Sequence, residues 1–208
     1  MSASLAAFLR HSGIRDERVL SAVAQVPRHL FVPEQLREDA DADRPLPIGC
    51  GQTISQPYVV AYMTERLRLA GDERVLEVGT GSGYQTALLA MLAEEVFSIE
   101  IVSDLAERAR HVLLEELGFR NVRLRVGDGA LGWPEEAPFN RVIVTAAAPY
   151  VPDALLQQLA PGGRMIIPVG EETDVQMLRV LDRGNDGANL EADILPVRFV
   201  PLTHGAAR

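Results

Sequence analysis

The stretch Val75-Leu76-Glu77-Val78-Gly79-Thr80-Gly81-Ser82-Gly83-Tyr84 decides the fold of this chain. Its first four residues predict a short buried strand, and the apolar run over residues 84–93 that follows the glycines predicts a helix. Glycines between a strand and a helix let the backbone turn sharply and approach a ligand closely. The stretch therefore predicts a ligand-binding turn.

The spacing of the glycines narrows the kind of ligand. The dinucleotide fingerprint is G-x-G-x-x-G, whereas here the pattern is G-x-G-x-G and Tyr84 stands where the third fingerprint glycine would be. The phosphate-binding pattern G-x-x-x-x-G-K-[ST] is also absent from the sequence. We therefore expect a nucleoside-like ligand that need not carry a pyrophosphate, and the spacing argues against a nicotinamide oxidoreductase.

Strands and helices alternate on both sides of this turn. Expected strands cover residues 75–78, 96–99, 122–126, 141–144 and 165–167, and expected helices cover residues 58–69, 84–93, 105–117 and 152–159. This alternation predicts a mostly parallel sheet covered by helices on both faces. Two further strand-like stretches near 176–180 and 197–200 flank the turn Asn185-Asp186-Gly187, which predicts an antiparallel edge.

The part of the chain before the sheet has a different character. Residues 16–26 predict a helix that Pro27 ends, and residues 33–57, rich in proline and glycine, predict a long loop. Loops of this length are usually binding loops or lids. We expect one domain over residues 1–208: a substrate-side element (1–56), a cofactor-binding core (57–170) and C-terminal strands (171–208).

Length and composition exclude several classes of protein. The 208 residues suffice for one domain of ordinary size. The 20 basic and 29 acidic residues give a formal charge of −9, which disfavours binding to a phosphate backbone. A single cysteine, Cys50, excludes an intramolecular disulfide, and the apolar runs are too short to span a bilayer. We expect a cytoplasmic protein that binds neither nucleic acid nor membrane.

Polar residues follow three of the expected strands at the point where each strand ends. Glu100 comes 21 residues after Gly79, Asp128 follows the strand 122–126, and Thr145 follows the strand 141–144. Ligands of open α/β sheets bind at this edge. S-adenosylmethionine fits the arrangement, with its ribose diol on Glu100, its adenine amine near Asp128 and its methionine part along the glycines.

Short motifs along almost the whole chain carry a resemblance to a known family. They include Val26-Pro27-Arg28, Phe31-Val32-Pro33, Gln52-Thr53-Ile54-Ser55-Gln56-Pro57, the glycine turn, Gly127-Asp128-Gly129, Pro161-Gly162-Gly163-Arg164 and Val200-Pro201-Leu202-Thr203. The chain resembles the protein-L-isoaspartate (D-aspartate) O-methyltransferases. The segments 53–57 and 200–203 are specific to that family, whereas the glycine turn marks only the broad methyltransferase class.

The resemblance implies a Rossmann-like methyltransferase fold with extra N- and C-terminal elements. It also implies S-adenosylmethionine as cofactor and the α-carboxylate of L-isoaspartyl or D-aspartyl residues in damaged proteins as acceptor. The cofactor-binding residues that it implies are Glu77, Gly79, Thr80, Gly81, Ser82, Glu100, Asp128, Gly129 and Thr203. Thr53, Ile54 and Ser55 are the implied substrate-binding residues, and Ser55 is the implied active-site residue.

The residue types allow three interpretations of Ser55. A carboxylate with a pKa near ~4 is already ionised at neutral pH and can attack a sulfonium methyl group without a general base. Ser55 could donate a hydrogen bond to that carboxylate. It could instead cap the helix that is expected to begin near Pro57. A covalent nucleophile is the third interpretation, and the sequence lacks the elbow G-x-S-x-G.

Other functions remain open at this point. The same fold could methylate a small-molecule or specialised peptide carboxylate, or bind a nucleoside without catalysis. No metal site is expected, because the four histidines are scattered and the pattern H-E-x-x-H is absent. The expected partners are isoaspartyl-containing proteins and peptides, and we expect a monomer.

Overall fold

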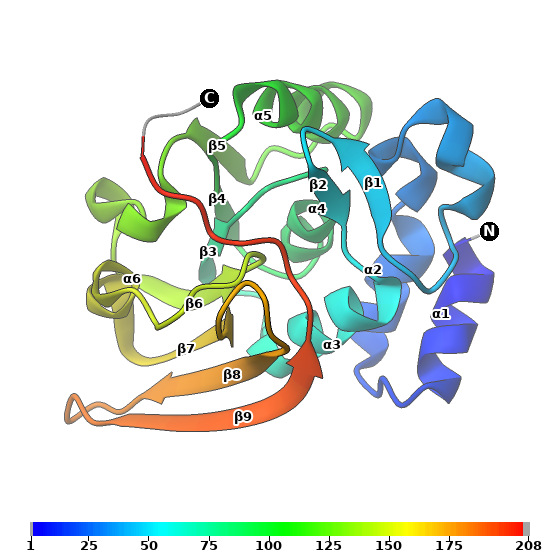
Figure 1. Cartoon of the computed structure of the whole chain (residues 1–208). Coiled ribbons are helices and arrows are strands. Elements are labelled where there is room, and N and C mark those ends of the chain that lie inside the picture. Colours follow the sequence, from blue (N-terminus) through cyan, green and yellow to red (C-terminus); the bar gives the residue numbers. More distant parts are fainter. Residues whose placement is uncertain (1, 206–208) are drawn as a thin grey trace.

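A seven-stranded sheet with helices on both faces forms the centre of the computed structural model, which describes residues 2–205 (Figure 1). Residues 1 and 206–208 of the expected domain lie outside the described residues. The helices are α1 (Ser2–His11), α2 (Glu17–Gln25), α3 (Pro57–Leu67), α4 (Tyr84–Ala90), α5 (Ser103–Arg110) and α6 (Asp153–Gln158). Short 3-10 helices are η1 (Arg28–Phe31), η2 (Glu34–Asp39), η4 (Gly129–Leu131) and η5 (Pro134–Glu136), and the π-helix η3 (His111–Glu116) directly follows α5.

The sheet runs in the order β5-β4-β3-β6-β7-β8-β9. Its strands are β3 (Arg74–Val78), β4 (Glu95–Glu100), β5 (Val122–Val126), β6 (Phe139–Val144), β7 (Leu159–Val169), β8 (Gln176–Arg183) and β9 (Asn189–Val197). The pairs from β5 to β7 are parallel, while β8 and β9 join antiparallel. This confirms the predicted mostly parallel sheet with an antiparallel edge.

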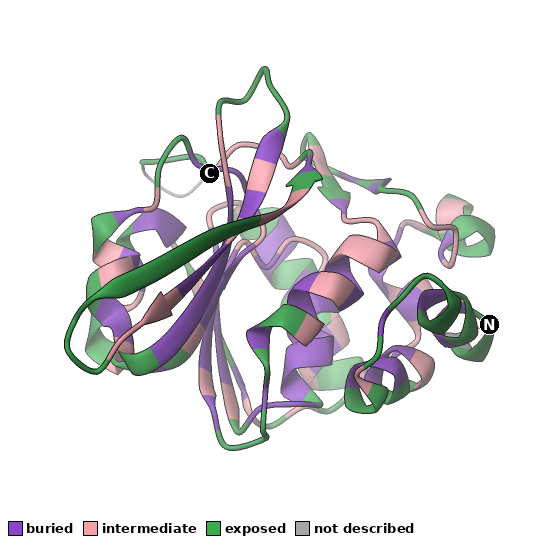
Figure 2. Ribbon diagram, turned by 90° about the horizontal axis from the view of Figure 1, so that it is seen from below, coloured by how far each residue is buried: buried purple, intermediate pink, exposed green. Residues whose placement is uncertain are grey.

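The two faces of the sheet bury separate apolar clusters. Val75 and Ile143 point toward the cluster that holds α1 to α5, and Leu76 and Val142 point toward the cluster that holds α6. Side chains of a strand alternate between faces, so apolar residues at successive positions are buried on both sides. Near-continuous apolar strands are typical of parallel sheets covered on both faces. At the edge of the sheet, β9 is largely exposed (Figure 2).

Several sequence-based expectations need correction in the N-terminal part. The expected loop 33–57 contains η2 and a two-stranded hairpin of β1 (Leu46–Gly49) and β2 (Gln52–Ile54). These elements are too short to show a clear hydrophobic period. Helix α1 was also not predicted from the sequence.

Two expectations near the C-terminus need correction as well. The strand expected near residues 197–200 is β9 at Asn189–Val197, because pairing with β8 rather than apolar alternation determines this edge strand. The turn expected at residues 161–163 lies within β7, where the pairing with β6 shifts register. In the part of the chain that the structure describes, no helix is both long and apolar enough to cross a membrane.

The buried position of Leu76 allows a test of the packing. We expect Leu76→Ala to lower the free energy of unfolding by ~2–5 kcal/mol, because it leaves a cavity in the central strand. The control is Leu190→Ala on β9, where the leucine is 75% exposed; it should change stability by less than ~0.5 kcal/mol. Urea denaturation measures both, and equal losses for the two variants would contradict the packing described above.

Candidate active site at the carboxyl edge of the sheet

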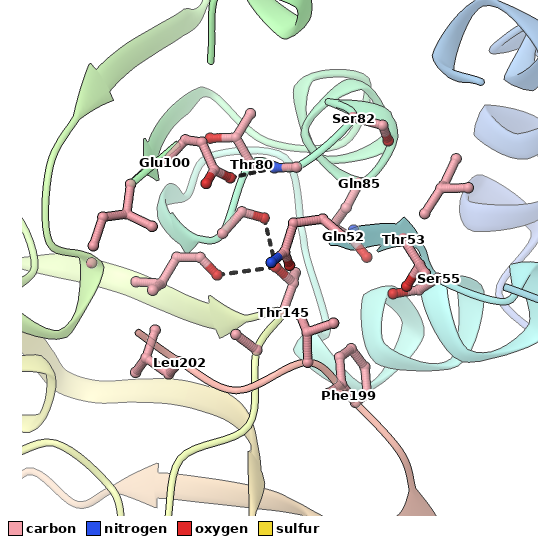
Figure 3. A pocket seen from close by; sticks show the side chains of 18 of the residues that line it. Gln52, Thr53, Ser55, Thr80, Ser82, Gln85, Glu100, Thr145, Phe199 and Leu202 are labelled. Carbon is pink, nitrogen blue, oxygen red and sulfur yellow. Dashed lines mark hydrogen bonds between the residues drawn. The ribbon is translucent and has the colours of Figure 1, made fainter. Parts of the chain in front are cut away.

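A pocket that is open to solvent at its mouth lies where the parallel strands end (Figure 3). Its walls come from three parts of the chain: the β1–β2 hairpin with α3, the segments after β3, β4, β5 and β6 with the start of α4, and the C-terminal segment. The predicted site residues that line it are Thr53, Ile54, Ser55, Gly79, Thr80, Gly81, Ser82, Glu100, Gly129 and Thr203. The structure thus brings most of the predicted site together in one cavity.

The glycine turn between β3 and α4 is held against neighbouring strands. The amides of Gly79 and Thr80 donate to the carbonyl oxygen of Ile99 at 2.8 and 3.2 Å. The Thr145 hydroxyl donates to the Gly79 carbonyl at 2.5 Å. A Cβ atom on Gly79 would collide with that hydroxyl, and its φ of +95° disfavours other residues. This turn therefore requires glycine at position 79.

Glu100 is an oriented hydrogen-bond acceptor at the end of β4. One oxygen accepts from the Gly81 amide at 2.7 Å, and the other accepts from the Val102 amide at 3.0 Å. The residue is only 5% exposed and lines the pocket. A carboxylate oxygen has more than one acceptor site, so both oxygens can still accept from a diol. The site therefore fits the ribose of a nucleoside cofactor.

Glu77 lies beneath the glycine turn and is not among the residues that line the pocket. Its carboxyl oxygen Oε2 accepts from the hydroxyls of Thr86 at 2.5 Å and Ser98 at 2.6 Å. The Ser98 hydroxyl is 2.5 Å from that of Thr80, which does line the pocket. Burial raises the pKa of Glu77 to about 8. Glu77 thus supports the turn from below, and the direct cofactor contact that the resemblance implied stays a prediction.

Asp128 is also outside the pocket lining, although the adjacent Gly129 is part of it. One Asp128 oxygen accepts from the Ala130 amide at 2.9 Å, and the other accepts from the Gly205 amide at 3.0 Å. The side chain therefore caps η4 and holds the C-terminal segment. Each Asp128 oxygen, like those of Glu100, has a further acceptor site, so the contact with the adenine amine stays a prediction.

The C-terminal segment closes one side of the pocket. After β9 the chain runs back across the carboxyl edge of the sheet (Figure 1). The Ala147 amide donates to the Val200 carbonyl at 2.8 Å, and the Leu202 amide donates to the Ala147 carbonyl at 2.7 Å. Residues 199–203 thereby become part of the wall.

Ser55 follows β2 and precedes α3, as expected, but it does not cap that helix. The N-cap residue of α3 is Gln56, which makes no side-chain cap hydrogen bond. Instead Asp43 accepts from the Tyr58 amide at 2.9 Å and from the Gln56 side chain at 2.8 Å. Within the described residues no hydrogen bond involves the Ser55 hydroxyl, so this group is available to a ligand.

A second cleft continues from Ser55. It shares Thr53, Ser55, Thr145, Phe199 and Val200 with the first pocket. Its remaining walls are Pro45, Gln56, Val59, Val175, Pro196, Val197 and Arg198. Ser55 therefore stands between an inner pocket and an outer cleft that could receive an extended chain.

Sequence reasoning missed several residues that line the pocket: Gln52, Met63, Tyr84, Gln85, Phe199, Val200, Pro201 and Leu202. Some of these residues could have been predicted from the sequence, because Gln52 and residues 200–202 lie within the motifs that carry the family resemblance. Met63 and Gln85 are helical residues outside those motifs. Only the packing of α3 and α4 against the glycine turn reveals them.

The protonation of Glu77 should be visible in stability. Because its pKa is raised from 4.5 to about 8, the native state retains a proton that the unfolded chain releases between these pH values. Stability should therefore fall as pH rises across that window. We expect Glu77→Gln to remove this decline, whereas the control Glu107→Gln on the exposed face of α5 should keep it. Urea denaturation at several pH values measures the effect, and parallel profiles for wild type and Glu77→Gln would contradict it.

Comparisons with known proteins identify the family of this chain. A family model described as Protein-L-isoaspartate(D-aspartate) O-methyltransferase matches residues 2–207. A protein-L-isoaspartate O-methyltransferase of Anaeromyxobacter dehalogenans is 69% identical over 98% of both chains. One of Myxococcus xanthus is 59% identical over 94% of this chain and 93% of its own.

Solved structures give the same result. A protein-L-isoaspartate O-methyltransferase superposes with a TM-score of 0.89 at 28% identity, covering 100% of this chain and 67% of that one. A second, from Plasmodium falciparum in complex with S-adenosyl-L-homocysteine, superposes with a TM-score of 0.84 at 27% identity, covering 97% and 98%. The resemblance seen in the motifs is thereby confirmed, and this chain belongs to the protein-L-isoaspartate(D-aspartate) O-methyltransferase family.

Proposed function

We propose that this protein transfers a methyl group from S-adenosylmethionine to the α-carboxylate of L-isoaspartyl and D-aspartyl residues in damaged proteins. The observation that carries the proposal is that Glu100 and Ser55 line one pocket of a chain that belongs to this family. A backbone amide nitrogen of the acceptor then attacks the methyl ester, methanol leaves and a succinimide forms, and hydrolysis of that ring restores some normal aspartate. The reaction would repair proteins rather than modify healthy ones.

The cofactor would be held by the edge of the sheet. Glu100 is oriented to accept from the ribose diol, and the turn from Gly79 to Ser82 leaves room for the methionine part. Gly129 would border the adenine, and Thr203 of the C-terminal segment also lines the pocket. When bound, S-adenosylmethionine supplies a methyl group activated by a positively charged sulfur.

The acceptor side needs no general base. The attacking carboxylate is already ionised at neutral pH, and it loses its negative charge when its oxygen gains the methyl group, so no proton has to move. Ser55 would donate one hydrogen bond that fixes the carboxylate for attack. Apolar residues such as Val60 and Met63 line the pocket. They would keep it dry and thereby strengthen the attraction between the opposite charges.

The outer cleft supports a polypeptide acceptor over a small molecule. It continues from Ser55 toward β9 and is open to solvent, so the chain on either side of an isoaspartyl residue has room there. A small carboxylate would need only the inner pocket. A small-molecule acceptor, one of the alternatives, would therefore leave this cleft without a role, whereas a specialised peptide acceptor would also fill it.

We further propose a cytoplasmic monomer that binds no nucleic acid. A single cysteine suits a reducing compartment. The formal charge of −9 disfavours a phosphate backbone.

Glu100→Ala should weaken cofactor binding, because the ribose diol loses its acceptor. Hydrogen bonds to charged groups contribute ~1.5–3 kcal/mol, so the Kd for S-adenosylhomocysteine should rise roughly tenfold to a hundredfold. The matched control is Glu95→Ala at the other end of the same strand, which should leave the Kd unchanged. Isothermal titration calorimetry gives both values. An unchanged Kd in folded Glu100→Ala would remove the assigned role of Glu100.

Ser55→Ala should lower turnover on an isoaspartyl peptide while leaving cofactor affinity and melting temperature nearly intact. If Ser55 donates one positioned hydrogen bond, the loss is on the order of a hundredfold to a thousandfold. The measurement compares methyl transfer to an isoaspartyl peptide and to its normal aspartyl counterpart, and only the former should be methylated.

Three other outcomes would change the proposal. Methylation of both peptides alike would reject the repair function. Wild-type turnover in Ser55→Ala would reject the role of Ser55. A trapped covalent adduct on Ser55 in the wild type would favour a nucleophilic mechanism instead.

A further inference from the structure

Arg28, in η1, is an arginine with no exposed surface. It belongs to the motif Val26-Pro27-Arg28, which the proposed mechanism does not use, and it is not among the residues that line the pocket. Burial lowers the pKa of its guanidinium group, and Tyr84 and Asp41 oppose that effect. The group nevertheless stays charged at neutral pH, because arginine is too strong a base to lose its proton there.

The Arg28 guanidinium joins two segments that are distant in sequence. Its Nε donates to the Ala40 carbonyl at 2.8 Å, and its Nη2 donates to the Ser55 carbonyl at 2.7 Å. Ala40 ends η2, and Ser55 is the residue proposed to bind the acceptor. One planar group therefore holds the backbone of Ser55 at a fixed distance from η2.

The same guanidinium also contacts the cofactor side of the pocket. Its central carbon lies 4.5 Å from the centre of the Tyr84 ring, and Phe31 meets that ring edge-on at 5.5 Å. Tyr84 directly follows Gly83, begins α4 and lines the pocket. Through this stacking contact, Arg28 connects the Ser55 segment with the glycine turn.

Stability alone does not account for a charge at this place. Taking an ion out of water costs several kcal/mol, and a well-packed apolar residue of similar volume often gives equal or greater stability. Among the described residues no carboxylate forms an ion pair with Arg28. What an apolar residue could not provide is the pair of directed hydrogen bonds to the carbonyls of Ala40 and Ser55.

Asp43 restrains the other side of the same segment. It accepts from the amide of Tyr58 and from the side chain of Gln56, the residue after Ser55. The backbone around Ser55 is thus fixed from both sides by groups that leave its hydroxyl unused. In Figure 3, Ser55 lies across the pocket from Glu100.

We propose that Arg28 is a positioning residue, which holds the Ser55 carbonyl so that the Ser55 hydroxyl is placed correctly relative to the glycine turn. This inference rests on the proposed role of Ser55. Arg28 itself would touch neither the acceptor nor the cofactor. Its effect on the reaction should therefore disappear when the Ser55 hydroxyl is absent.

A double-mutant cycle tests that dependence. The variants are Arg28→Lys, Ser55→Ala and the double variant. For each variant, kcat and KM are measured with an isoaspartyl peptide, and the Kd for S-adenosylhomocysteine is measured separately. Lysine keeps the charge but lacks the planar fork that reaches both carbonyls. A misplacement near 1 Å can cost about a hundredfold, so we expect Arg28→Lys to lower kcat by roughly tenfold to a hundredfold with Kd unchanged. In the Ser55→Ala background the same change should lower kcat by less than about twofold. Deviations of that size also occur between independent sites, so a loss below it counts as no effect.

Arg141→Lys is the matched control. Arg141 also donates to backbone carbonyls, those of Leu67 at 2.8 Å and Arg68 at 3.2 Å, at the start of β6 and away from the pocket. It should lower the melting temperature without lowering kcat. If Arg28→Lys does not fold, Arg28→Gln replaces it, because glutamine still donates hydrogen bonds but carries no charge. Its kcat is then compared in the same two backgrounds.

The outcomes separate the two proposals. If Arg28→Lys lowers kcat by the same factor in the wild-type and Ser55→Ala backgrounds, the positioning role is overturned and the role of Ser55 stays intact. A kcat unchanged by Arg28→Lys alone would also overturn it. Wild-type turnover in Ser55→Ala alone would reject the role of Ser55 and, with it, this inference.

Discussion

The parallel register of β3 with β4 and β6 is the constraint on which the rest of the structure depends. Val78 lies opposite both Ile99 and Val144, so the chain leaves the three strands at the same level. The glycine turn, Glu100 and Thr145 follow at once and are close enough to bond: Ile99 accepts from the turn and Thr145 donates to it. The cofactor side of the site is thus a direct consequence of strand pairing.

The acceptor side depends on segments added at both ends of this sheet. The β1–β2 hairpin contributes Thr53 to Ser55, and the segment after β9 contributes Phe199 to Thr203. Each is tied to the core by hydrogen bonds that the sheet itself does not provide, such as those of Ala147 with Val200 and Leu202. The same sheet edge could serve many methyl transfers, whereas these two segments would determine the acceptor.

Buried polar groups connect the two sides. Glu77 supports the glycine turn through Ser98 and Thr80, while Arg28 holds the Ser55 backbone. Both groups are unfavourable to bury, since Glu77 has a raised pKa and Arg28 a lowered one. Such groups add directional hydrogen bonds that apolar packing lacks, and here those bonds end on residues that line the pocket. Burying these groups therefore lowers stability but fixes the geometry of the site.

The sequence by itself determined the alternation of strands and helices, the glycine turn and the position of Glu100 at a strand end, because hydrophobic period and glycine placement are local properties. Motif resemblance added Ser55 and the segment 200–203. Tertiary structure alone decided that Glu77 and Asp128 bond to protein groups and do not line the pocket. It also decided that Asp43, and not Ser55, accepts from the first turn of α3. Finally, it decided that Arg28 reaches the Ser55 carbonyl. These contacts join residues between 9 and 77 positions apart, and no local pattern encodes which side chain meets which backbone group once the chain has folded.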